Sequence, residues 1–384
     1  MLLKIGTMCG PVPTSGLLPL FPPRQSQNNM ADVIDRTLII RFSSVGDIIL
    51  SSLLLRVLQK RFPECMIDYL VKTEYSDLVR FNPNVSRVVE FPEGGGLPVL
   101  RQIRETLRAT NYDLVIDIHD SLRSRYLCRE LSNVVRIRKR KIARFLLVKT
   151  KWNVYEFFGG APNVAERYIE TVRGLGVEND GKGLEVFIPP TALVRVEKIL
   201  QGAGIGNDGV VIGICPAAKH QNKMWLKERF AETASMLARD HNAAVLLFGS
   251  GKKEEIRCEE IKSALEKGSP DVPVLNLACL LSLPETAAMM DRCSIVITND
   301  SGLMHLAAAR KRKVVAIFGP TVRELGFFPY GTTSTVIEDI SLSCRPCTHI
   351  GLPECPKGHF KCMKNISAVQ VTDAARQLLS LPGT

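Results

Sequence analysis

A short polar turn in the second half of the chain has the composition of a phosphate-binding site. Residues 299–305 read Asn-Asp-Ser-Gly-Leu-Met-His and directly follow an expected strand at 294–298. Backbone N–H groups at the start of a helix together carry about half a positive charge and can hold a diphosphate, to which Ser301 adds a hydroxyl donor. Alternatively, Asp300 or Ser301 only caps the helix, and His305 belongs to the core.

Two further strand ends carry groups that suit an anion. The sequence Phe-Gly-Pro-Thr allows close backbone approach at Gly319 and offers a hydroxyl at Thr321. The loop after the expected strand 210–215 holds Lys219 and Lys223. Lys223 could neutralise a departing diphosphate, although a lysine in a loop is commonly only solvated.

Two carboxylates also lie just after the ends of expected strands. Asp47 ends the motif Ser-Ser-Val-Gly-Asp after the expected strand 37–42, where a carboxylate could take a proton from a reacting hydroxyl. The alternative is that it only stabilises a helix N-terminus. Glu254 follows a glycine-bearing strand end and could hydrogen-bond a ribose, but an acidic first helical turn is ordinary and we favour that interpretation there.

The elements that must position these groups alternate between strand and helix. In the first half we expect strands at 37–42, 66–71, 88–91 and 114–118 and helices at 48–61 and 97–110. In the second half we expect strands at 210–215, 243–249, 274–277, 294–298 and 314–318 and helices at 227–240, 253–267, 283–291 and 302–310. This alternation predicts an α/β fold with two doubly wound parallel sheets, which bind ligands at the carboxyl ends of their strands.

The length of 384 residues is more than one hydrophobic core usually serves, so we expect two domains. The predicted divisions are a disordered tail at 1–29, an N-terminal domain at 30–190, an interdomain linker at 191–209, a C-terminal domain at 210–365 and a C-terminal helix at 366–384. We expect that last helix to pack back toward the N-terminal domain.

A net charge of +11 predicts an anionic partner. Eight of the positive charges fall within 136–151, which we expect at the surface. No recognised nucleic-acid module accompanies them, and aromatic residues are not interleaved with the basic runs as stacking platforms, so we predict no nucleic-acid partner. No run approaches the roughly 18 apolar residues of a membrane-spanning helix.

Eleven cysteines without an export signal indicate reduced thiols in a cytosol. Four of them cluster near the end of the chain and begin with a Cys-x-x-Cys pair: Cys344, Cys347, Cys355 and Cys362. Four thiolates could bind a structural zinc, with His349 and His359 in reserve. We expect no metal in any other role.

The motifs in this order resemble glycosyltransferase family 9, the ADP-heptose:lipopolysaccharide heptosyltransferases, over 37–379. The resemblance is carried by Ser-Ser-Val-Gly-Asp at 43–47, Thr-Asn-Asp-Ser-Gly-Leu-Met-His at 298–305, Phe-Gly-Pro-Thr at 318–321 and the cysteine-rich tail at 344–363. The second of these motifs is most similar to the heptosyltransferase II branch. The chain contains no Asp-x-Asp, the carboxylate pair with which many one-domain glycosyltransferases hold a divalent metal. In this family such cysteines occur without an accepted catalytic metal.

The resemblance implies a GT-B fold, in which two Rossmann-like domains face each other across a cleft. It further implies an inverting, metal-independent transfer of heptose from ADP-L-glycero-β-D-manno-heptose to the lipopolysaccharide inner core, without a cofactor. The donor would lie on the C-terminal domain and a lipid A-Kdo-linked acceptor on the N-terminal domain. The protein would be cytoplasmic and peripherally associated with the anionic inner leaflet of the inner membrane.

Carried over by motif, Asp47 is the catalytic base and Lys223 the partner of the diphosphate. The expected donor-binding residues are Lys219, Glu254, Asp300, Ser301, Gly302, His305, Gly319 and Thr321. The expected acceptor-binding residues are Ser44, Arg123, Arg125, Arg138 and Arg140. The chain departs from the family at 118–124, where a glycine is common, and at Gly251, near the usual acidic ribose ligand.

Two alternatives remain open. One is another GT-B sugar-nucleotide enzyme, a transferase to a different glycan or an epimerase, which donor competition would separate. The other is a non-enzymatic nucleic-acid-binding protein that uses the basic runs 138–141 and 310–313. Salt-dependent DNA retention without sugar-nucleotide binding would identify it.

Overall fold

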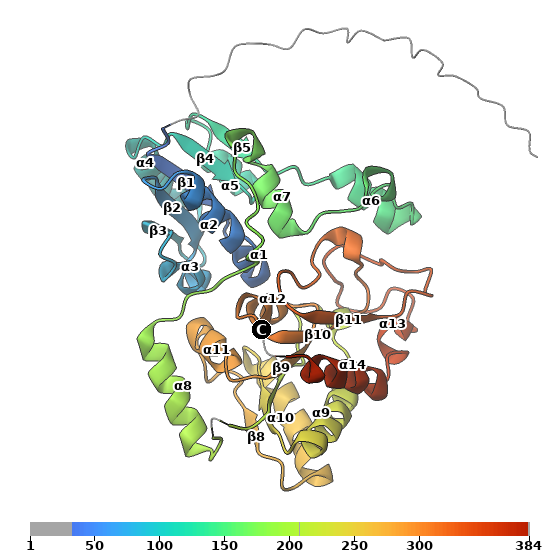
Figure 1. The fold of residues 1–384 in the computed structure, drawn as a ribbon. Helices are drawn as coiled ribbons and strands as arrows, with labels where there is room; N and C mark the ends of the chain where they lie inside the picture. The colour runs from blue at the N-terminus through green and yellow to red at the C-terminus, as the bar shows by residue number, and fades with distance from the viewer. Residues whose placement is uncertain (1–32, 207, 383–384) are drawn as a thin grey trace, which may run out of the picture. The chain divides into compact units, whose positions relative to one another are not determined.

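The computed structural model describes residues 33–206 and 208–382, so the tail predicted at 1–29 lies outside the described residues. From Ile34 onward these residues form one compact unit that contains two parallel sheets (Figure 1). The predicted α/β class with two doubly wound sheets is confirmed.

The first sheet has the strand order β3-β2-β1-β4-β5, and every pair is parallel. Its strands are β1 (Arg36–Ile40), β2 (Met66–Lys72), β3 (Arg87–Phe91), β4 (Leu114–Asp117) and β5 (Val134–Arg136). At the centre, Ile39 lies between Tyr69 and Ile116, and all three side chains are fully buried. A central strand that is covered on both faces needs a continuous apolar run, which is what the sequence supplies.

The first half also contains the following helices, of which the short 3-10 helices are labelled η. They are α1 (Val45–Leu50), α2 (Ser52–Arg61), η1 (Thr73–Tyr75), α3 (Asp77–Arg80), α4 (Leu97–Ala109), α5 (Leu122–Leu127), α6 (Lys141–Thr150), η2 (Glu156–Phe158), α7 (Val164–Glu170) and η3 (Arg173–Leu175). The single helix expected at 48–61 is interrupted at Ser51. Its hydroxyl donates to the Ile48 carbonyl at 2.7 Å and bonds the Tyr69 hydroxyl at 2.7 Å. Its N–H still donates to the Asp47 carbonyl at 3.2 Å, so the interruption is a local turn.

The second sheet has the strand order β11-β10-β9-β6-β7-β8 and is also parallel. Its strands are β6 (Val211–Cys215), β7 (Ala244–Leu247), β8 (Val274–Asn276), β9 (Ile295–Asn299), β10 (Lys313–Phe318) and β11 (Ser334–Glu338). Ile297 of β9 lies between Ile214 and Val315, and all three are fully buried. Edge strand β11 was not predicted.

The helices of the second half are α8 (Pro190–Gly202), η4 (Gln221–Lys223), α9 (Lys227–His241), α10 (Lys252–Gly268), α11 (Leu283–Met290), α12 (Gly302–Ala309), η5 (Arg323–Leu325), α13 (Lys361–Lys364) and α14 (Ala368–Ser380). Most of the stretch expected as a linker, 191–209, is helix α8. Its buried residues Ala192, Val196 and Leu200 recur every four positions, so α8 packs along one apolar stripe.

The predicted packing of the C-terminal helix toward the N-terminal half is wrong. The buried face of α14, including Val371 and Leu378, belongs to the same core cluster as Trp225 and Ile295 of the second half. Arg376 also forms an ion pair with Asp240 of α9 at 2.7 Å. The helix packs there because its apolar stripe covers the second sheet, beside α9.

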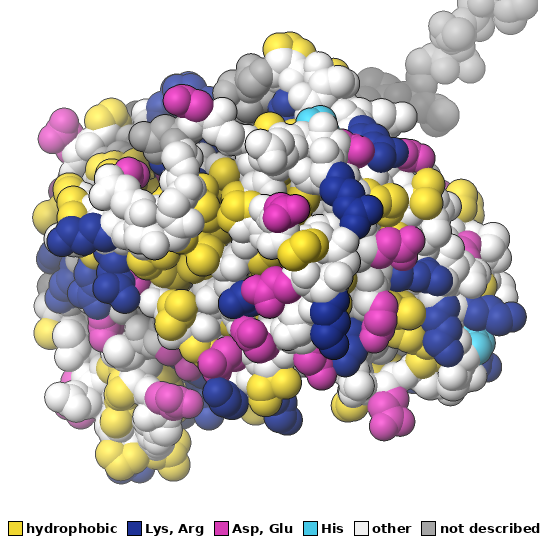
Figure 2. All heavy atoms as spheres, turned by 90° about the horizontal axis from the view of Figure 1, so that it is seen from below, with side chains coloured by type: hydrophobic (Ala, Val, Ile, Leu, Met, Phe, Trp, Pro, Cys, Tyr) yellow, Lys and Arg dark blue, Asp and Glu magenta, His cyan; other side chains and the backbone are white. Residues whose placement is uncertain are grey.

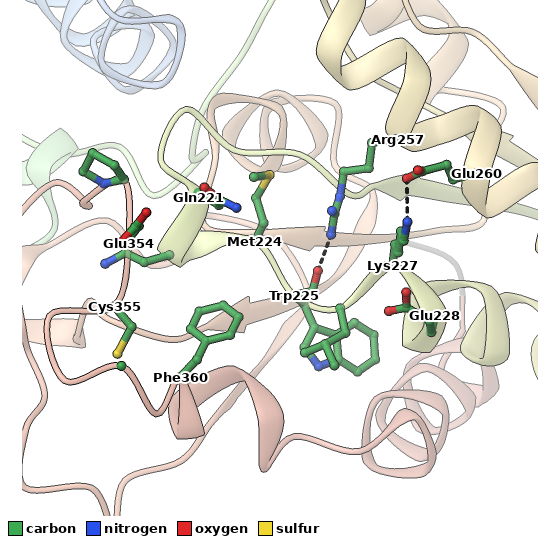
Figure 3. Close-up of a pocket in the computed structure, with 14 residues that line it drawn as sticks. Gln221, Met224, Trp225, Lys227, Glu228, Arg257, Glu260, Glu354, Cys355 and Phe360 are labelled. Atoms are coloured by element: carbon green, nitrogen blue, oxygen red, sulfur yellow. Dashed lines mark hydrogen bonds and ion pairs between the residues drawn. The ribbon is translucent and has the colours of Figure 1, made fainter.

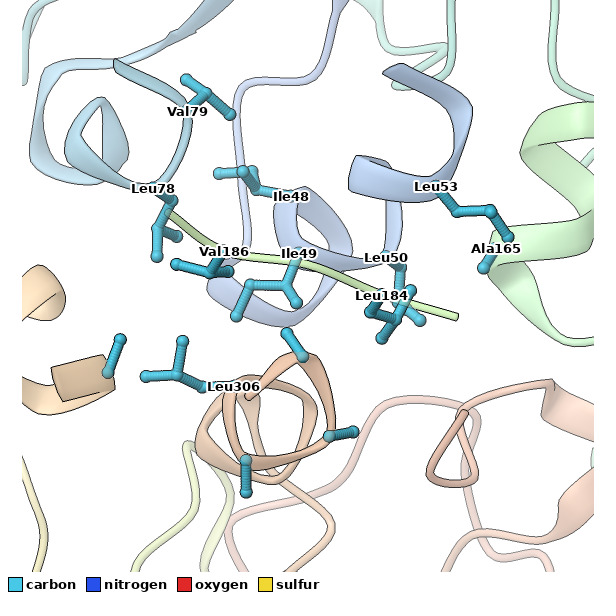
Figure 4. Packing of buried hydrophobic residues seen from close by; sticks show 14 of the residues in the cluster. Ile48, Ile49, Leu50, Leu53, Leu78, Val79, Ala165, Leu184, Val186 and Leu306 are labelled. Atoms are coloured by element: carbon cyan, nitrogen blue, oxygen red, sulfur yellow. The ribbon is translucent and has the colours of Figure 1, made fainter. Parts of the chain in front are cut away.

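The two halves share a hydrophobic core where α1 meets α12. Ile49 of α1, Val186 and Leu306 of α12 belong to one buried cluster, and Figure 4 shows Ile49 and Val186 pointing toward α12. Helix α1 follows β1 and α12 follows β9. The carboxyl ends of these two central strands are therefore brought close together, which is where doubly wound sheets bind ligands.

Candidate active site

Asp47 lies in the first turn of α1 and has polar partners on both carboxylate oxygens. Its Oδ1 forms an ion pair with Arg41 at 2.6 Å and accepts a bond from the Tyr168 hydroxyl at 3.3 Å. Its Oδ2 accepts from the Ser44 hydroxyl at 2.9 Å and from the Ser44 N–H at 3.3 Å. Asp47 thus forms a capping box with Ser44, so the helix-stabilising role is present, but only one oxygen serves it.

These contacts keep Asp47 ionised. Burial raises the pKa of this carboxyl, but the Arg41 charge and the hydrogen bonds from Ser44 outweigh burial, and the pKa lies below its ordinary value of 3.8. Arg41 is itself fixed because its guanidinium also donates to the Ile118 carbonyl at 2.8 Å. At neutral pH Asp47 is therefore a carboxylate with proton-accepting capacity.

A second charged cluster joins three loops of the second half. Lys223, the last residue of η4, forms an ion pair with Asp300 Oδ2 at 2.6 Å. The Thr321 hydroxyl donates to the same oxygen at 2.7 Å. Asp300 therefore connects the loops after β6, β9 and β10 through its Oδ2 oxygen. Ser301 is the N-cap residue of α12 but makes no side-chain capping bond, so the capping alternative does not describe either residue.

His305 lies between the two clusters. A Cβ placed on Gly46 would be 2.7 Å from His305 Cδ2, so the α1 backbone touches the imidazole. Burial lowers the pKa of His305 to about 4, while the charges of Asp300 and Asp47 act in the opposite direction. His305 Nδ1 is buried and has no hydrogen-bond partner. The ring is therefore neutral at pH 7, and its buried Nδ1 is left unsatisfied.

Two further side chains fix the second cluster, and neither of them was given a role from the sequence. The Asn299 amide accepts from the Trp225 N–H at 2.9 Å and donates to the Pro216 carbonyl at 2.8 Å, which pins the Lys223 loop to the end of β9. Arg345 donates to the Gly319 carbonyl and, at 2.8 Å, to the Thr321 carbonyl. The position of Asn299 at a strand end was the one available signal.

Glu254 and Lys219 are not among the bonded partners of the Lys223–Asp300 pair. The Glu254 carboxylate accepts from the Ser250 N–H at 2.7 Å and closes the loop at the start of α10. This is the helix-start role that we favour for Glu254 from the sequence. Burial raises the pKa of Glu254 above 4.5. Lys219 is exposed. Of the donor-binding set, the structure joins Asp300 and Thr321 by a hydrogen bond and packs Gly302 and His305 against α1.

The arginines expected at the acceptor do not converge on Asp47. Arg125 pairs with Asp120 at 2.7 Å, and Arg140 pairs with Glu170 at 3.2 Å. Arg123 lies over the ring of Phe91, at 5.7 Å from its centroid. Ser44 is the member of the acceptor set that touches Asp47, and Arg138 is exposed.

Two cavities open near these clusters. One of about 1150 Å³ lies between α6, α7 and η5 and is lined in part by Arg140, Lys141 and Glu166. The other, of about 470 Å³, lies behind the Lys223 loop (Figure 3), where Arg257 donates to the Trp225 carbonyl. Both are large enough for a sugar-sized or nucleotide-sized group.

The cysteine-rich tail supports the site without a preformed metal centre. The Cys347 N–H donates to the Pro320 carbonyl at 3.0 Å, and Cys344 Sγ lies 3.8 Å from His359 Nε2. Within 33–206 and 208–382, no group of three or more His, Cys, Asp or Glu side chains is placed to hold a metal ion. The described part of the chain also has no helix long and apolar enough to cross a membrane.

The profile of glycosyltransferase family 9 (heptosyltransferase) matches residues 100–357. The chain is 30% identical over 295 residues to lipooligosaccharide heptosyltransferase 2 of Haemophilus influenzae, covering 74% of this chain and 83% of that protein. It is 29% identical over 301 residues to lipopolysaccharide heptosyltransferase 2 of Escherichia coli K12, with the same two coverages.

Solved structures agree on the fold. The family 9 glycosyl transferase of Veillonella parvula superposes with a TM-score of 0.73 at 23% identity and covers 92% of this chain and 99% of its own. The ADP-heptose lps heptosyltransferase II of E. coli gives a TM-score of 0.66 at 23% identity, with coverages of 90% and 98%. The predicted GT-B arrangement is therefore confirmed. With its family profile, its relatives and its fold in agreement, this chain belongs to glycosyltransferase family 9 and is a glycosyltransferase.

Proposed function

We propose that this enzyme transfers heptose from ADP-L-glycero-β-D-manno-heptose to the inner core of lipopolysaccharide, with inversion and without a metal ion. The observation that carries the proposal is the meeting of two clusters at the carboxyl ends of β1 and β9. An ionised carboxylate, Asp47, stands on one side, and the Lys223–Asp300 pair stands on the other, with neutral His305 between them. The named relatives are heptosyltransferases of lipopolysaccharide or lipooligosaccharide.

In this proposal, proton transfer to Asp47 accompanies the attack of the acceptor. An acceptor hydroxyl attacks the anomeric carbon from the face opposite the ADP group, and its proton moves to the Asp47 carboxylate. The carbon–oxygen bond to ADP breaks, and its electron pair stays on the β-phosphate oxygen. Because the attack and the departure occur on opposite faces, the configuration at the anomeric carbon inverts. Positioned base catalysis of this kind contributes about 10²–10⁴ in rate.

Arg41 and Tyr168 position the base. The ion pair at 2.6 Å keeps the carboxylate ionised but also weakens it as a base. Proton transfer therefore has to accompany bond formation, since the hydroxyl becomes acidic only as it attacks. The unpartnered His305 Nδ1 supplies a further polar contact within the same space.

The charge that develops on the leaving ADP is met by Lys223 and the N-terminus of α12. Lys223 is held by Asp300, and Ser301 and Gly302 begin α12 next to this pair, where the first N–H groups of a helix have no partner within the helix. Preorganised donors of this kind stabilise an oxyanion without reorganisation at the moment of reaction. In the absence of an Asp-x-Asp motif, these groups take the part that a divalent metal plays in other glycosyltransferases.

The cavity between α6, α7 and η5 is the proposed acceptor site. It borders the helix that carries Tyr168, a direct partner of Asp47. Its lining carries three cationic side chains, those of Arg140, Lys141 and Arg323, together with four carboxylates, those of Glu156, Glu166, Glu170 and Glu324. The Kdo carboxylates and lipid A phosphates of the acceptor call for such guanidinium and ammonium groups.

The test is single-turnover transfer by Asp47→Asn, with ADP-heptose and truncated lipopolysaccharide, read by product mass. We expect kcat to fall about 10²–10⁴-fold while the Kd for the ADP-sugar hardly changes. Asp271→Asn is the matched control, because Asp271 is exposed. Turnover by folded Asp47→Asn within a few-fold of the parent would refute the assignment. Transfer from a different sugar nucleotide in the same assay would refute the donor.

A further inference from the structure

The segment 136–157 combines basic and exposed apolar side chains in an unusual way. Between Leu131 and Tyr155 the chain has no acidic residue, whereas 136–151 contains eight lysines and arginines. On the face seen in Figure 2, by contrast, side chains of both charge signs are interspersed. Four large apolar side chains of the segment are exposed to water: Ile142 at 78%, Phe145 at 59%, Trp152 at 55% and Phe157 at 74%.

The exposed groups belong to α6 and to the short segment that follows it. On α6, Lys141, Ile142, Phe145 and Lys149 are exposed and recur at spacings of three and four residues, so they line one side of the helix. Trp152 and Phe157 follow the helix and contact each other edge to face, with ring centroids 6.5 Å apart. We call these six residues the α6 surface.

The opposite side of α6 anchors the segment to the protein. Leu147 is buried in a small cluster with Tyr155 and Leu325 of η5, and Lys151 donates to the Pro346 carbonyl at 2.5 Å. Leu147 and Lys151 thus fix the segment to the protein. The apolar groups of the α6 surface are exposed and take no part in these contacts. Contiguous exposed apolar groups on a structured segment mark an interaction site.

We propose that the α6 surface docks onto an anionic phospholipid bilayer, with Trp152 and Phe157 inserted at the level of the headgroups. Aromatic and aliphatic groups flanked by lysine and arginine are what an interfacial segment presents to such a surface. A protein partner would need acidic groups over the whole of this area, whereas an anionic bilayer supplies both the negative charge and the apolar layer beneath it.

Docking at this surface would also place the proposed acceptor site against the membrane. Lys141 and Ile142 belong to the α6 surface and also line the cavity of about 1150 Å³. A lipid-linked acceptor could then enter the cavity from the bilayer without leaving it. This last step rests on the proposed function, whereas the docking itself does not.

The chain carries its own reporter for the test. It has two tryptophans, of which Trp152 is 55% exposed and Trp225 is fully buried. Added to vesicles of phosphatidylglycerol and phosphatidylcholine, without acceptor or sugar nucleotide, the parent should show tryptophan emission shifted to shorter wavelength. Trp152→Phe should still bind in a pelleting assay but lose the shift, because Trp225 does not change its surroundings.

Matched variants distinguish docking through the α6 surface from nonspecific adsorption to vesicles. Trp152→Ser with Phe157→Ser should lower the vesicle partition coefficient by about tenfold or more, and Lys141→Glu with Lys149→Glu should lower it by about fivefold or more per charge. In the control, Leu193→Ser is combined with Val194→Ser, since both residues are exposed on α8. This double variant should leave the partition coefficient unchanged. The proposal is overturned if all variants bind equally, or if the parent binds equally well to vesicles of phosphatidylcholine alone. It is also overturned by a concentration-dependent emission shift without vesicles, which indicates self-association. Transfer to a soluble delipidated acceptor tests the proposed function separately.

Discussion

Gly46→Ala should impair transfer because the methyl group has no room where the two halves meet. The added Cβ would lie 2.7 Å from His305 Cδ2 and 3.6 Å from Gly302 Cα. Carbon atoms in contact settle at about 3.5–4.0 Å, so the neighbouring atoms must move apart by about 0.8 Å. Gly46 lies in helix α1 and is not among the positive-φ residues, so the conflict is one of space alone.

The structure indicates which way the conflict is relieved. His305 is only 3% exposed and cannot swing into solvent, so α1 has to move away from α12 and carry Asp47 with it. Overpacking of this kind costs about 1–3 kcal/mol of folding free energy. A displacement of about 1 Å between reacting groups can cost about 10² in rate, and we therefore expect kcat to fall about 10–100-fold.

The assay is kcat and KM for both substrates, with Tm measured on the same preparations. Gly202→Ala is the control, because a Cβ there meets nothing within 4 Å and alanine is favoured over glycine in a helix by about 0.5–1 kcal/mol. If Gly46→Ala retains both the turnover and the Tm of the parent, α1 and α12 do not touch in the working enzyme, and the placement of His305 beside Asp47 has to be abandoned.

Two further predictions concern charge in the site. Lys223→Met should lower kcat about 10–100-fold, since a hydrogen bond to a charged group contributes about 1.5–3 kcal/mol; single-turnover rates equal to those of the exposed control Lys198→Met would contradict this. Burial lowers the pKa values of His305 and His119 to about 4. The unfolded chain therefore binds protons between pH 6.5 and 4 that the folded protein does not, and stability should fall as the pH drops through this window. Each histidine contributes about 1.4 kcal/mol per pH unit to the slope of the free energy of unfolding against pH. Urea unfolding of His305→Asn at several pH values should therefore give a shallower slope than the parent, and an unchanged slope would contradict the burial of the ring.

The fold could be predicted from the sequence wherever a strand is buried on both faces. The strands β1 and β9 are continuous apolar runs because helices cover both sides of them. The edge strand β11 was missed because its residues are all half-buried, which leaves a weaker apolar signal. The packing of α14 was also missed, since an apolar stripe shows that a helix packs but not which sheet receives it.

The site was predictable only in part, because strand ends are visible in a sequence and long-range partners are not. Asp47 and Asp300 each follow a predicted strand, and a doubly wound topology gathers such positions at one edge. Tyr168 is 121 residues from Asp47 in the sequence, and no local pattern connects them. Arg41 directly follows β1, where a charge alone does not reveal its partner.

The cysteine-rich tail has a structural reason to accompany the donor loops. Arg345 lies between two of its cysteines and holds the carbonyls of Gly319 and Thr321. Thr321 in turn donates to Asp300, and Asp300 pairs with Lys223. The tail thus reaches the proposed diphosphate site through consecutive hydrogen bonds and ion pairs. This connection needs no metal ion. The Cys-x-x-Cys segment therefore contributes to the site through Arg345, which fixes the turn that contains Gly319 and Thr321.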